Sequence, residues 1–421
     1  MLERAEALGT SWAYAKPLEK YDEDSAILLD NVQFIYELAL AELELESFGL
    51  RYTITNGLRS FRLLEPRRRQ LPEIRRRVAY FKALGGKACD YFQLIRWNRT
   101  RSVNQYLTHW IYPYKGKFHP QMIRAVLNII GLKPGDTVLD PFIGSGTTAV
   151  EAQLLGINCL GIDVSPLCIL QSWVKTHAYR LVDQARARAD WFLNQAGSNL
   201  FAQEQVAQEN VLSKLEDDGL RKFFLMALLV ATSDVARRGR LFDRALSSNL
   251  RRMIDSASDF REGVETLRLR PGKVDLVEGD ARNLKLEDSS IDGIVTSPPY
   301  SIALDYVAND EHALRAMGVD PRKARGDFMG VRGIGKARVG LYNEDLKQSI
   351  AEMARVLKPE RHAVIVIGNA TYQGQEVKTV DYTIKQAEKA GLKLVRDINK
   401  IIFGLYNVMQ KESILFFQKE R

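Results

Sequence analysis

The stretch that decides the fold is DTVLDPFIGSGTT, residues 136–148 of this 421-residue chain. Its apolar beginning, residues 137–139, predicts a short buried β-strand. Gly144 and Gly146 come next, and glycine tolerates the positive φ angles and the close ligand approach of a tight turn. We expect a helix over residues 148–155. The stretch therefore predicts a strand, a glycine-rich turn and a helix in succession.

A second strand is expected at residues 158–163, and it ends in Asp163. An acidic side chain about 20 residues past a glycine turn is suited to accept hydrogen bonds from ribose hydroxyls. The turn lacks the G-x-G-x-x-G spacing of dinucleotide-binding folds, which disfavours a pyrophosphate cradle. Asp140, directly before the turn, is placed to accept from an ammonium group, which a nicotinamide cofactor lacks. These features favour a ligand other than a nicotinamide dinucleotide.

The second informative motif is TSPPY, residues 296–300. It follows an apolar run, residues 291–295, that predicts another short buried strand. Two successive prolines donate no backbone N–H and fix φ, so the segment is stiff and its carbonyls face something other than a sheet neighbour. Tyr300 adds a flat aromatic face. Rigid acceptors beside an aromatic ring suit a planar base that carries an amino group, although a plain turn is the simpler interpretation of this motif alone.

Together, in this order and at two strand ends, the motifs resemble those of the S-adenosylmethionine-dependent amino-methyltransferases of nucleic acids, especially the cytosine-N4 DNA methyltransferases. Residues 112–120 are similar to the segment that closes over the methionine end of the cofactor there, and residues 279–281 match the adenine contact. The resemblance implies that S-adenosylmethionine is bound by Lys117, Phe118, Asp140, Pro141, Phe142, Gly144, Ser145, Gly146, Thr147, Asp163, Asp280, Ala281 and Thr296. The catalytic residues that it implies are Ser297, Pro298, Pro299 and Tyr300.

Enzymes of this family methylate the exocyclic amine of a base, which must be flipped out of a duplex or already unpaired. Serine at position 297, in place of aspartate, resembles the cytosine-N4 enzymes more than the adenine-N6 enzymes. The motifs are most similar to those of DNA enzymes, yet no separate target-recognition domain is evident after Tyr300, so ribosomal or transfer RNA stays an alternative. A non-catalytic nucleic-acid-binding subunit and a small-molecule methyltransferase are the rival classes.

Composition agrees with a polyanionic partner. The net charge is +8 and the pI is about 9.2, while hydrophobic content of 46% allows a sizeable core. Three cysteines without a C-x-x-C pair predict reduced thiols, a cytoplasmic location and no zinc or other metal site. No apolar run is long enough to cross a bilayer, so no membrane association is expected. The oligomeric state is not indicated.

Three regions are expected along the chain. Residues 1–105 form an N-terminal accessory region, with helical spacing over Ala26 to Ser47 and strands over Arg51 to Leu64. Residues 106–175 and 272–421 form the methyltransferase domain, and residues 176–271 a helical insertion, either a substrate-recognition lobe or a cover over the sheet. Alternating strands and helices predict an α/β, Rossmann-like, mostly parallel sheet with an antiparallel pair at its edge.

Two basic clusters are the candidate nucleic-acid contacts, because arginine binds phosphate through charge and fork geometry. The first belongs to the accessory region and contains Arg67, Arg68, Arg69, Arg75 and Arg76. The second lies in a glycine-rich stretch, residues 324–340, that we expect to be an irregular mobile loop over the active site. Its predicted contacts are Arg325, Arg332, Lys336 and Arg338. A solvated helix face and a plain linker are the alternative interpretations.

Overall fold

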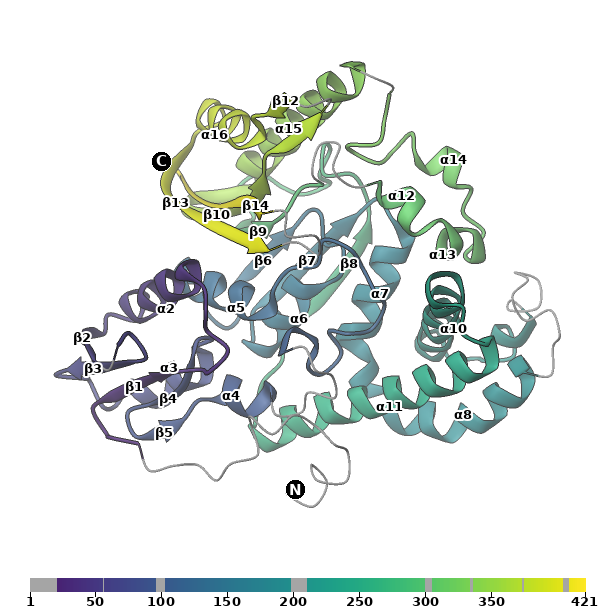
Figure 1. Cartoon of the computed structure of the whole chain (residues 1–421), viewed down its shortest axis with the longest axis horizontal. Coiled ribbons are helices and arrows are strands. Elements are labelled where there is room, and N and C mark those ends of the chain that lie inside the picture. Colours follow the sequence, from purple (N-terminus) through teal and green to yellow (C-terminus); the bar gives the residue numbers. More distant parts are fainter. Residues whose placement is uncertain are drawn as a thin grey trace.

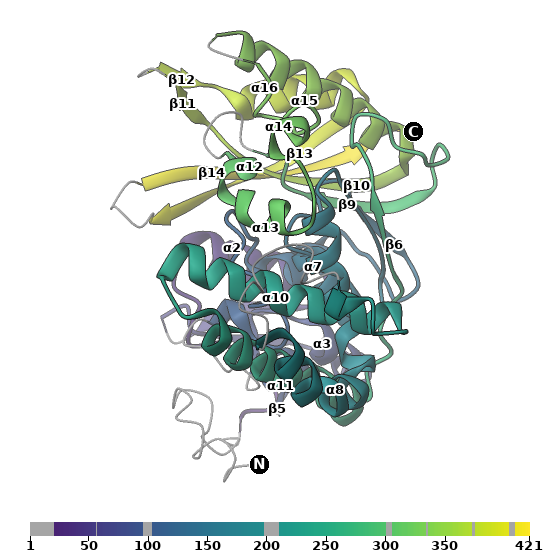
Figure 2. The same cartoon turned by 90° about the vertical axis from the view of Figure 1, so that its right-hand side faces the viewer.

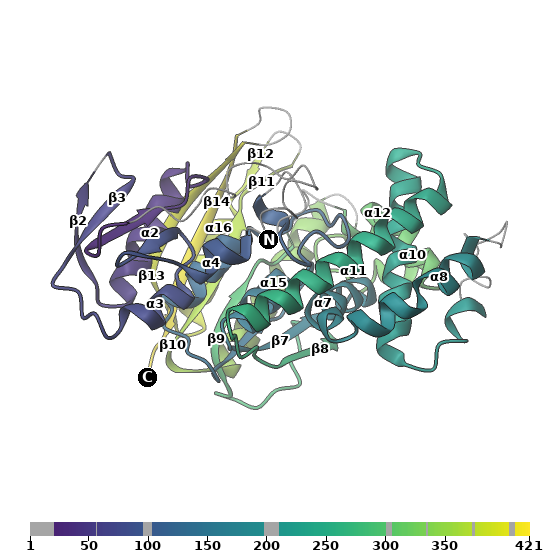
Figure 3. The same ribbon diagram turned by 90° about the horizontal axis from the view of Figure 1, so that it is seen from below.

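The computed structural model describes residues 21–55, 57–95, 103–197, 210–299, 305–333, 336–372, 375–403 and 409–421. Figure 1 shows a large central sheet flanked by two additions, a small N-terminal sheet on one side and a helical insertion on the other. Figure 3, seen from below, places the same two additions at opposite ends of the molecule. In the described residues no helix combines the length and the apolar composition needed to cross a membrane.

The large sheet has the strand order β13-β14-β10-β9-β6-β7-β8. Its strands are β6 (Thr137–Asp140), β7 (Asn158–Asp163), β8 (Val274–Glu278), β9 (Ile291–Thr296), β10 (Leu357–Gly368), β13 (Leu392–Phe403) and β14 (Met409–Lys419). The five strands from β8 to β10 are parallel, and β14 pairs antiparallel with both β10 and β13. The predicted mostly parallel sheet with an antiparallel edge pair is therefore confirmed.

Alternation along the strands explains why both faces of this sheet are covered. Val138 of β6 belongs to the core beneath α5 (Pro120–Ile129) and α6 (Thr147–Leu154), whereas its neighbour Leu139 belongs to the core beneath α15 (Lys336–Val356). Successive side chains of a strand point to opposite faces, so an uninterrupted apolar run needs helices on both. The remaining covering helices are α7 (Pro166–His177) and α16 (Thr379–Lys389).

The N-terminal region is a five-stranded antiparallel sheet of order β2-β3-β1-β4-β5. It comprises β1 (Ser25–Leu28), β2 (Arg51–Thr55), β3 (Ser60–Leu64), β4 (Phe81–Leu84), β5 (Lys87–Ala88), α2 (Ile35–Ser47), α3 (Leu71–Arg77) and α4 (Asp90–Leu94). The expected helical span over Ala26 to Ser47 is wrong at its start, because β1 buries alternate residues, Ala26 and Leu28, between two partner strands.

This small sheet is fastened to the large one through buried polar groups. Glu44 of α2 accepts hydrogen bonds from the backbone N–H of Ala79 (2.9 Å) and from Nδ2 of Asn128 on α5 (2.7 Å). Arg77 donates to Oδ1 of the same Asn128 (3.1 Å) and to the carbonyl of Leu132 (2.6 Å). Burial raises the pKa of Glu44 to about 7. One continuous apolar core runs across this boundary, so the two sheets form one body.

The predicted insertion is helical, with α8 (Val182–Gly197), α10 (Asp218–Arg238) and α11 (Phe242–Thr266) around a core of their own. One side of α10 is buried in this core, through Phe223, Phe224, Met226, Leu228, Leu229 and Val230. The sheet helix α7 also contributes to this core and ends at His177, so the expected boundary between residues 175 and 176 falls inside a helix. Short elements complete the chain: η3 (Val103–Gln105), η4 (Ala178–Arg180), β11 (Ala370–Tyr372) and β12 (Gln375–Val377).

The stretch after the TSPPY motif is more regular than the sequence predicts. It forms α12 (Tyr306–Asn309), α13 (Glu311–Ala316) and α14 (Pro321–Ala324), and α15 already begins at Lys336. The expected irregular loop over residues 324–340 is therefore wrong at both ends. Aspartate caps explain two of these starts, since Asp305 accepts from the N–H of Ala308 and Asp320 from that of Arg322. Figure 2 shows α12 and α13 between the large sheet and α10.

We expect Gly272→Ala to lower the free energy of unfolding by about 1–3 kcal/mol or more. Gly272 lies where the insertion returns to the sheet, and an added Cβ would stand 2.0 Å from the carbonyl oxygen of Ile157, a backbone atom that cannot move aside. Denaturant unfolding measures the change. Gly340→Ala is the matched control, because nothing lies within 4 Å of its Cβ position on α15. Equal stability of the two variants would contradict the expectation.

Candidate active site

Asp140, at the end of β6, joins the glycine turn to the TSPPY segment. Its Oδ1 accepts from the hydroxyl of Thr296 (2.6 Å) and the N–H of Phe142 (3.2 Å), and its Oδ2 accepts from the hydroxyl of Thr148 (2.7 Å). The carboxyl group is buried, and burial raises its pKa to about 6 despite these hydrogen bonds. One acid therefore ties together the ends of β6 and β9 and the first turn of α6.

The glycine turn is held from behind by α7. Gln171 donates to the carbonyl of Gly144 (3.0 Å), and the buried ammonium of Lys175 donates to the carbonyl of Ser145 (2.7 Å). Gly146 has φ +76° and packs so closely that a Cβ would stand 2.6 Å from Oγ of Ser172. The positive φ angle and the close packing against Ser172 together explain why position 146 needs glycine.

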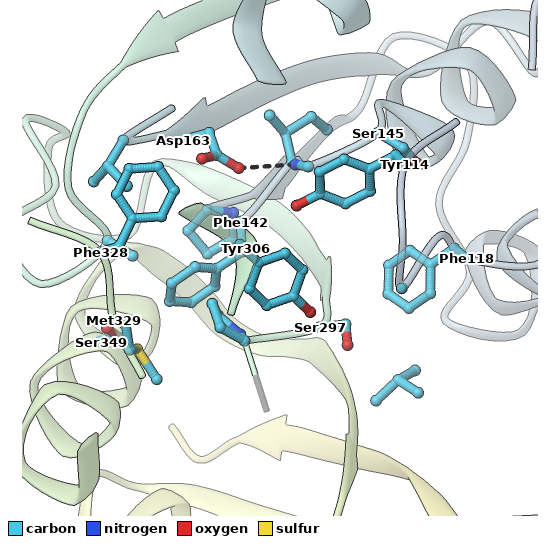
Figure 4. Close-up of a pocket in the computed structure, with 18 of the residues that line it drawn as sticks. Tyr114, Phe118, Phe142, Ser145, Asp163, Ser297, Tyr306, Phe328, Met329 and Ser349 are labelled. Carbon is cyan, nitrogen blue, oxygen red and sulfur yellow. Dashed lines mark hydrogen bonds between the residues drawn. The ribbon is translucent and has the colours of Figure 1, made fainter. Parts of the chain in front are cut away.

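Asp163, at the end of β7, borders the same turn. Its Oδ2 accepts from the N–H of Gly144 and its Oδ1 from the N–H of Ser165, both at 2.9 Å. Figure 4 shows the first of these bonds at the edge of a pocket. Burial raises the pKa of this carboxyl group to about 6. Each oxygen has further lone pairs, so the carboxylate can still accept from a ligand hydroxyl.

The turn and the TSPPY segment share one cavity of about 350 Å³. This volume falls in the range that small-molecule and cofactor sites occupy. Many predicted site residues line it: Lys117, Phe118, Pro141, Phe142, Gly144, Ser145, Asp163, Asp280, Ala281, Ser297 and Pro299. Figure 4 shows Asp163, Phe328 and Met329 toward one end of the cavity and Ser297 and Phe118 toward the other. Residues of both motifs therefore line the same cavity.

Other predicted residues do not line the cavity. Asp140, Thr147, Thr296 and Pro298 are buried, and Gly146 packs against α7. For Asp140 and Thr296 the reason is their mutual hydrogen bond, which directs both inward. The side chains of Asp140 and Thr296 therefore lie behind the cavity wall and support it. Tyr300 lies outside the described residues.

Aromatic side chains that the sequence did not single out form much of the wall. Tyr114 and Tyr306 stack with ring centroids 6.0 Å apart, and Phe328 faces the cavity from the segment before α15. Tyr114 falls inside the predicted segment 112–120, which was a usable signal. Tyr306 and Phe328 follow no motif, since only the folding of the α12–α14 stretch brings them here.

A charged network closes the end of the cavity near Asp280. Arg282 donates to both oxygens of Asp280 (2.9 Å each from Nε), to Asp345 of α15 (3.0 Å) and to the carbonyl of Asp327 (3.3 Å). Arg332 also pairs with Asp345. These bonds fasten the segment that carries Phe328 over the cavity. Arg282 was not among the residues singled out from the sequence: Asp280 is two positions away, but its other partners, Asp327 and Asp345, lie 45 and 63 residues away.

The arginines predicted to contact nucleic acid differ in their exposure to solvent and in whether they form ion pairs or hydrogen bonds within the protein. Arg67, Arg69 and Arg76 are exposed on the N-terminal region and form no ion pair among the described residues, whereas Arg68 pairs with Glu23 at 2.6 Å. Arg75 is half-buried. In the second cluster Arg325 pairs with Asp305 (2.7 Å), Arg332 with Asp345, and Arg338 donates to the carbonyl of Gly330 (2.6 Å). The side chain of Lys336 lies outside the described part of the chain.

One family model matches part of this chain. Residues 64–171, which contain the glycine turn and Asp163, match the N6_N4_Mtase model, whose description is DNA methylase. This region, about a quarter of the chain, is therefore similar to the N4/N6 amino-methyltransferases.

Three known proteins show how far the similarity extends. This chain is 25% identical to the type II methyltransferase M.BsoBI of Geobacillus stearothermophilus, over 53% of this chain and 55% of that protein. It is 48% identical to M.MjaII of Methanocaldococcus jannaschii, over 17% of this chain and 13% of that one. A tRNA (guanine(10)-N2)-dimethyltransferase of Methanothermobacter thermautotrophicus is 32% identical over 18% of this chain and 23% of its own length. The chain thus spans about half or less of these relatives.

We expect Thr296→Val to lower the free energy of unfolding by about 1–2 kcal/mol, because it leaves the buried Asp140 without one of its donors. Valine has nearly the same shape as threonine, so the decrease in stability measures the lost hydrogen bond. Denaturant unfolding at neutral pH measures it. Thr53→Val, on the exposed face of β2, is the control and leaves stability nearly unchanged. A Thr296→Val variant as stable as the control would argue against the tie between the two motifs.

Proposed function

We propose that the protein transfers a methyl group from S-adenosylmethionine to the exocyclic amine of a base in DNA, with cytosine N4 as the favoured target. The observation that carries the proposal is the shared cavity: the glycine turn and the Ser297–Pro299 turn open into the same space. Parallel strands bind ligands at their carboxyl ends near the point where strand order reverses, and β6 and β9 lie at that point. A methyl donor and an acceptor base meet there.

The residues of the cavity fit the proposed cofactor. Asp163 offers carboxylate oxygens to ribose hydroxyls, and Asp280 with Ala281 borders the place proposed for the adenine. Tyr114, Tyr306 and Phe142 present aromatic faces, which attract a cationic sulfonium. S-adenosylmethionine supplies an electrophilic methyl group on that sulfonium. The roles of Lys117 and Phe118 at the methionine end, and of Gly144 and Ser145 in the turn, stay part of this proposal.

The chemical task of the chain is to make the amine nucleophilic. Its lone pair is delocalised into the ring, so acceptors must hold the two amine hydrogens and favour a tetrahedral nitrogen. The hydroxyl and the carbonyl of Ser297, which lines the cavity, are proposed for this, with Tyr300 stacking on the base. These bonds strengthen as positive charge develops on nitrogen, which accelerates the step. Pro298 is buried behind the turn, and its carbonyl would take part only if the turn shifts when the base binds. The S–CH₃ bond breaks as the N–CH₃ bond forms, and the amine releases one proton to solvent.

The choice of target is a narrower part of the proposal. Serine at 297 favours cytosine N4 over adenine N6, which stays the alternative. Two relatives are type II methyltransferases, which supports DNA, whereas the partial likeness to a tRNA dimethyltransferase supports structured RNA as the second candidate. The exposed Arg67, Arg69 and Arg76 would contact phosphates of either polymer. Arg325, Arg332 and Arg338 would have to exchange their present partners to do so.

Transfer of tritiated methyl groups from S-adenosylmethionine to total DNA and total RNA tests the proposal, with nucleoside mass spectrometry to identify the product. Label in N4-methyldeoxycytidine is the expected result. Label in N6-methyldeoxyadenosine would show that the target base is adenine and not cytosine. Label confined to a ribonucleoside would show that the substrate is RNA and not DNA. Absence of transfer to both polymers, with the cofactor bound in calorimetry, would overturn the proposed activity.

We expect Ser297→Ala and Tyr300→Ala to lower turnover about 10- to 1,000-fold while cofactor affinity is kept, because both residues are assigned to the acceptor base. Single-turnover transfer and calorimetry with S-adenosylmethionine separate the two effects. Ser290→Ala is the control, since its hydroxyl donates only to the carbonyl of Glu287 at the far end of β9. Wild-type turnover in both test variants would remove these residues from the mechanism.

Cofactor binding should weaken as pH falls through about 6, the raised pKa of Asp163. Ribose hydroxyls donate to the carboxylate, so the charged form of Asp163 binds the cofactor better than the protonated form. For a group with this pKa, protonation weakens cofactor binding about tenfold at pH 5 relative to pH 7 and above. Calorimetry across this range measures the slope. Asp163→Asn should bind more weakly at pH 7 and show a smaller slope. An unchanged slope in Asp163→Asn would assign the pH dependence to other groups.

A further inference from the structure

A buried ion pair lies in the wall of the cavity and has no role in the mechanism above. Nζ of Lys400 on β13 stands 2.6 Å from Oε2 of Glu412 on β14, and the two residues are direct cross-strand partners. Their side chains are only 11% and 10% exposed, yet both line the cavity. The hairpin that carries them is the antiparallel addition to the sheet.

The strand register places this pair at the acceptor end of the cavity. Ile365 of β10 pairs with Thr296, so Val366, which lines the cavity, lies level with the start of the Ser297 turn. Glu412 pairs with Gly368, two residues further toward the carboxyl end of β10 and therefore on the same face as Val366. The ion pair thus borders the space that the amine-binding turn opens into, away from Asp163 and Asp280.

The energetics of the pair argue against a purely structural role. Withdrawing two charges from water costs several kcal/mol per ion, and a packed apolar pair of similar volume often stabilises a fold as well or better. Within the described residues Glu412 is the one hydrogen-bond partner of the Lys400 ammonium, which has three N–H groups. Two donors are left for a ligand in a cavity whose catalytic turn supplies acceptors.

We propose that Lys400, held in place by Glu412, is a specificity-determining residue that donates to the acceptor atoms beside the target amine. The inference rests on the proposed function and narrows its substrate. On cytosine, a ring nitrogen and then a carbonyl oxygen follow the amine along the Watson–Crick edge. On adenine the ring nitrogen is followed by a C–H group. An ammonium with two free donors therefore favours cytosine, and its loss weakens recognition of the base without touching the cofactor.

The test compares three variants on unmethylated genomic DNA. Lys400→Met should lower kcat/KM about 10- to 100-fold, the worth of hydrogen bonds from a charged donor, while the Kd for S-adenosylmethionine stays at the wild-type value. The fraction of methyl label found on adenine should rise. Lys393→Met, on the exposed part of the same strand, is the control and should behave as wild type.

The double variant Lys400→Met/Glu412→Leu separates recognition from folding. It also removes the buried carboxylate that has lost its Lys400 partner in the single variant, so a structural role predicts that activity returns. A recognition role predicts that kcat/KM stays low in a protein of wild-type melting temperature. Restored activity in the double variant, full activity in Lys400→Met, or a parallel loss of cofactor affinity would each overturn the inference. If wild-type protein methylates no DNA or RNA, the proposed function itself fails.

Discussion

The site depends on one buried carboxylate. Asp140 accepts hydrogen bonds from Thr296, Thr148 and the backbone of Phe142, and these donors come from two loops and a helix. The loops follow neighbouring parallel strands, β6 and β9, at the point where strand order reverses. Without this common acceptor, no side-chain hydrogen bond of Asp140 would hold the two loops at a fixed distance from each other. With it, the glycine turn and the Ser297 turn have a fixed spacing, and the cavity between them is preformed.

A second acid fixes the rim of the cavity. Oδ1 of Asp310 accepts from the hydroxyl of Tyr112 and from Arg237 of α10, both at 2.9 Å. Arg237 also donates to the carbonyl of Pro113 (3.1 Å). The helical insertion is thereby joined to the segment before α5 and to the α12–α13 stretch that carries Tyr306. The insertion therefore helps to position the aromatic wall, whatever it contributes to substrate recognition.

Charge is distributed unevenly between the surface and the cavity. At the cavity, Arg282 is paired with Asp280 and Asp345, and Lys400 with Glu412, whereas Lys117 donates to the backbone carbonyls of Asn104 and His109. Arg67, Arg69 and Arg76, which form no ion pair with any residue that the structure describes, lie outside, on a region that shares its core with the large sheet through α2 and α5. Under the proposed function, an anionic polymer would be attracted to this surface, and the cavity would select the base by hydrogen bonds.

The sequence by itself determined the parallel sheet, its edge pair, the glycine turn and the TSPPY motif, because each rests on local periodicity or on residues within a few positions of one another. It missed β1, where a short alternating run precedes a helical one, and the short helices after Tyr300, two of which begin at an aspartate cap. Only the tertiary structure decided that Asp140 accepts a hydrogen bond from Thr296, and that Tyr306, Arg282 and Lys400 reach the cavity. These residues come from elements far apart in the chain, and burial and strand register, which no local pattern records, bring those elements together.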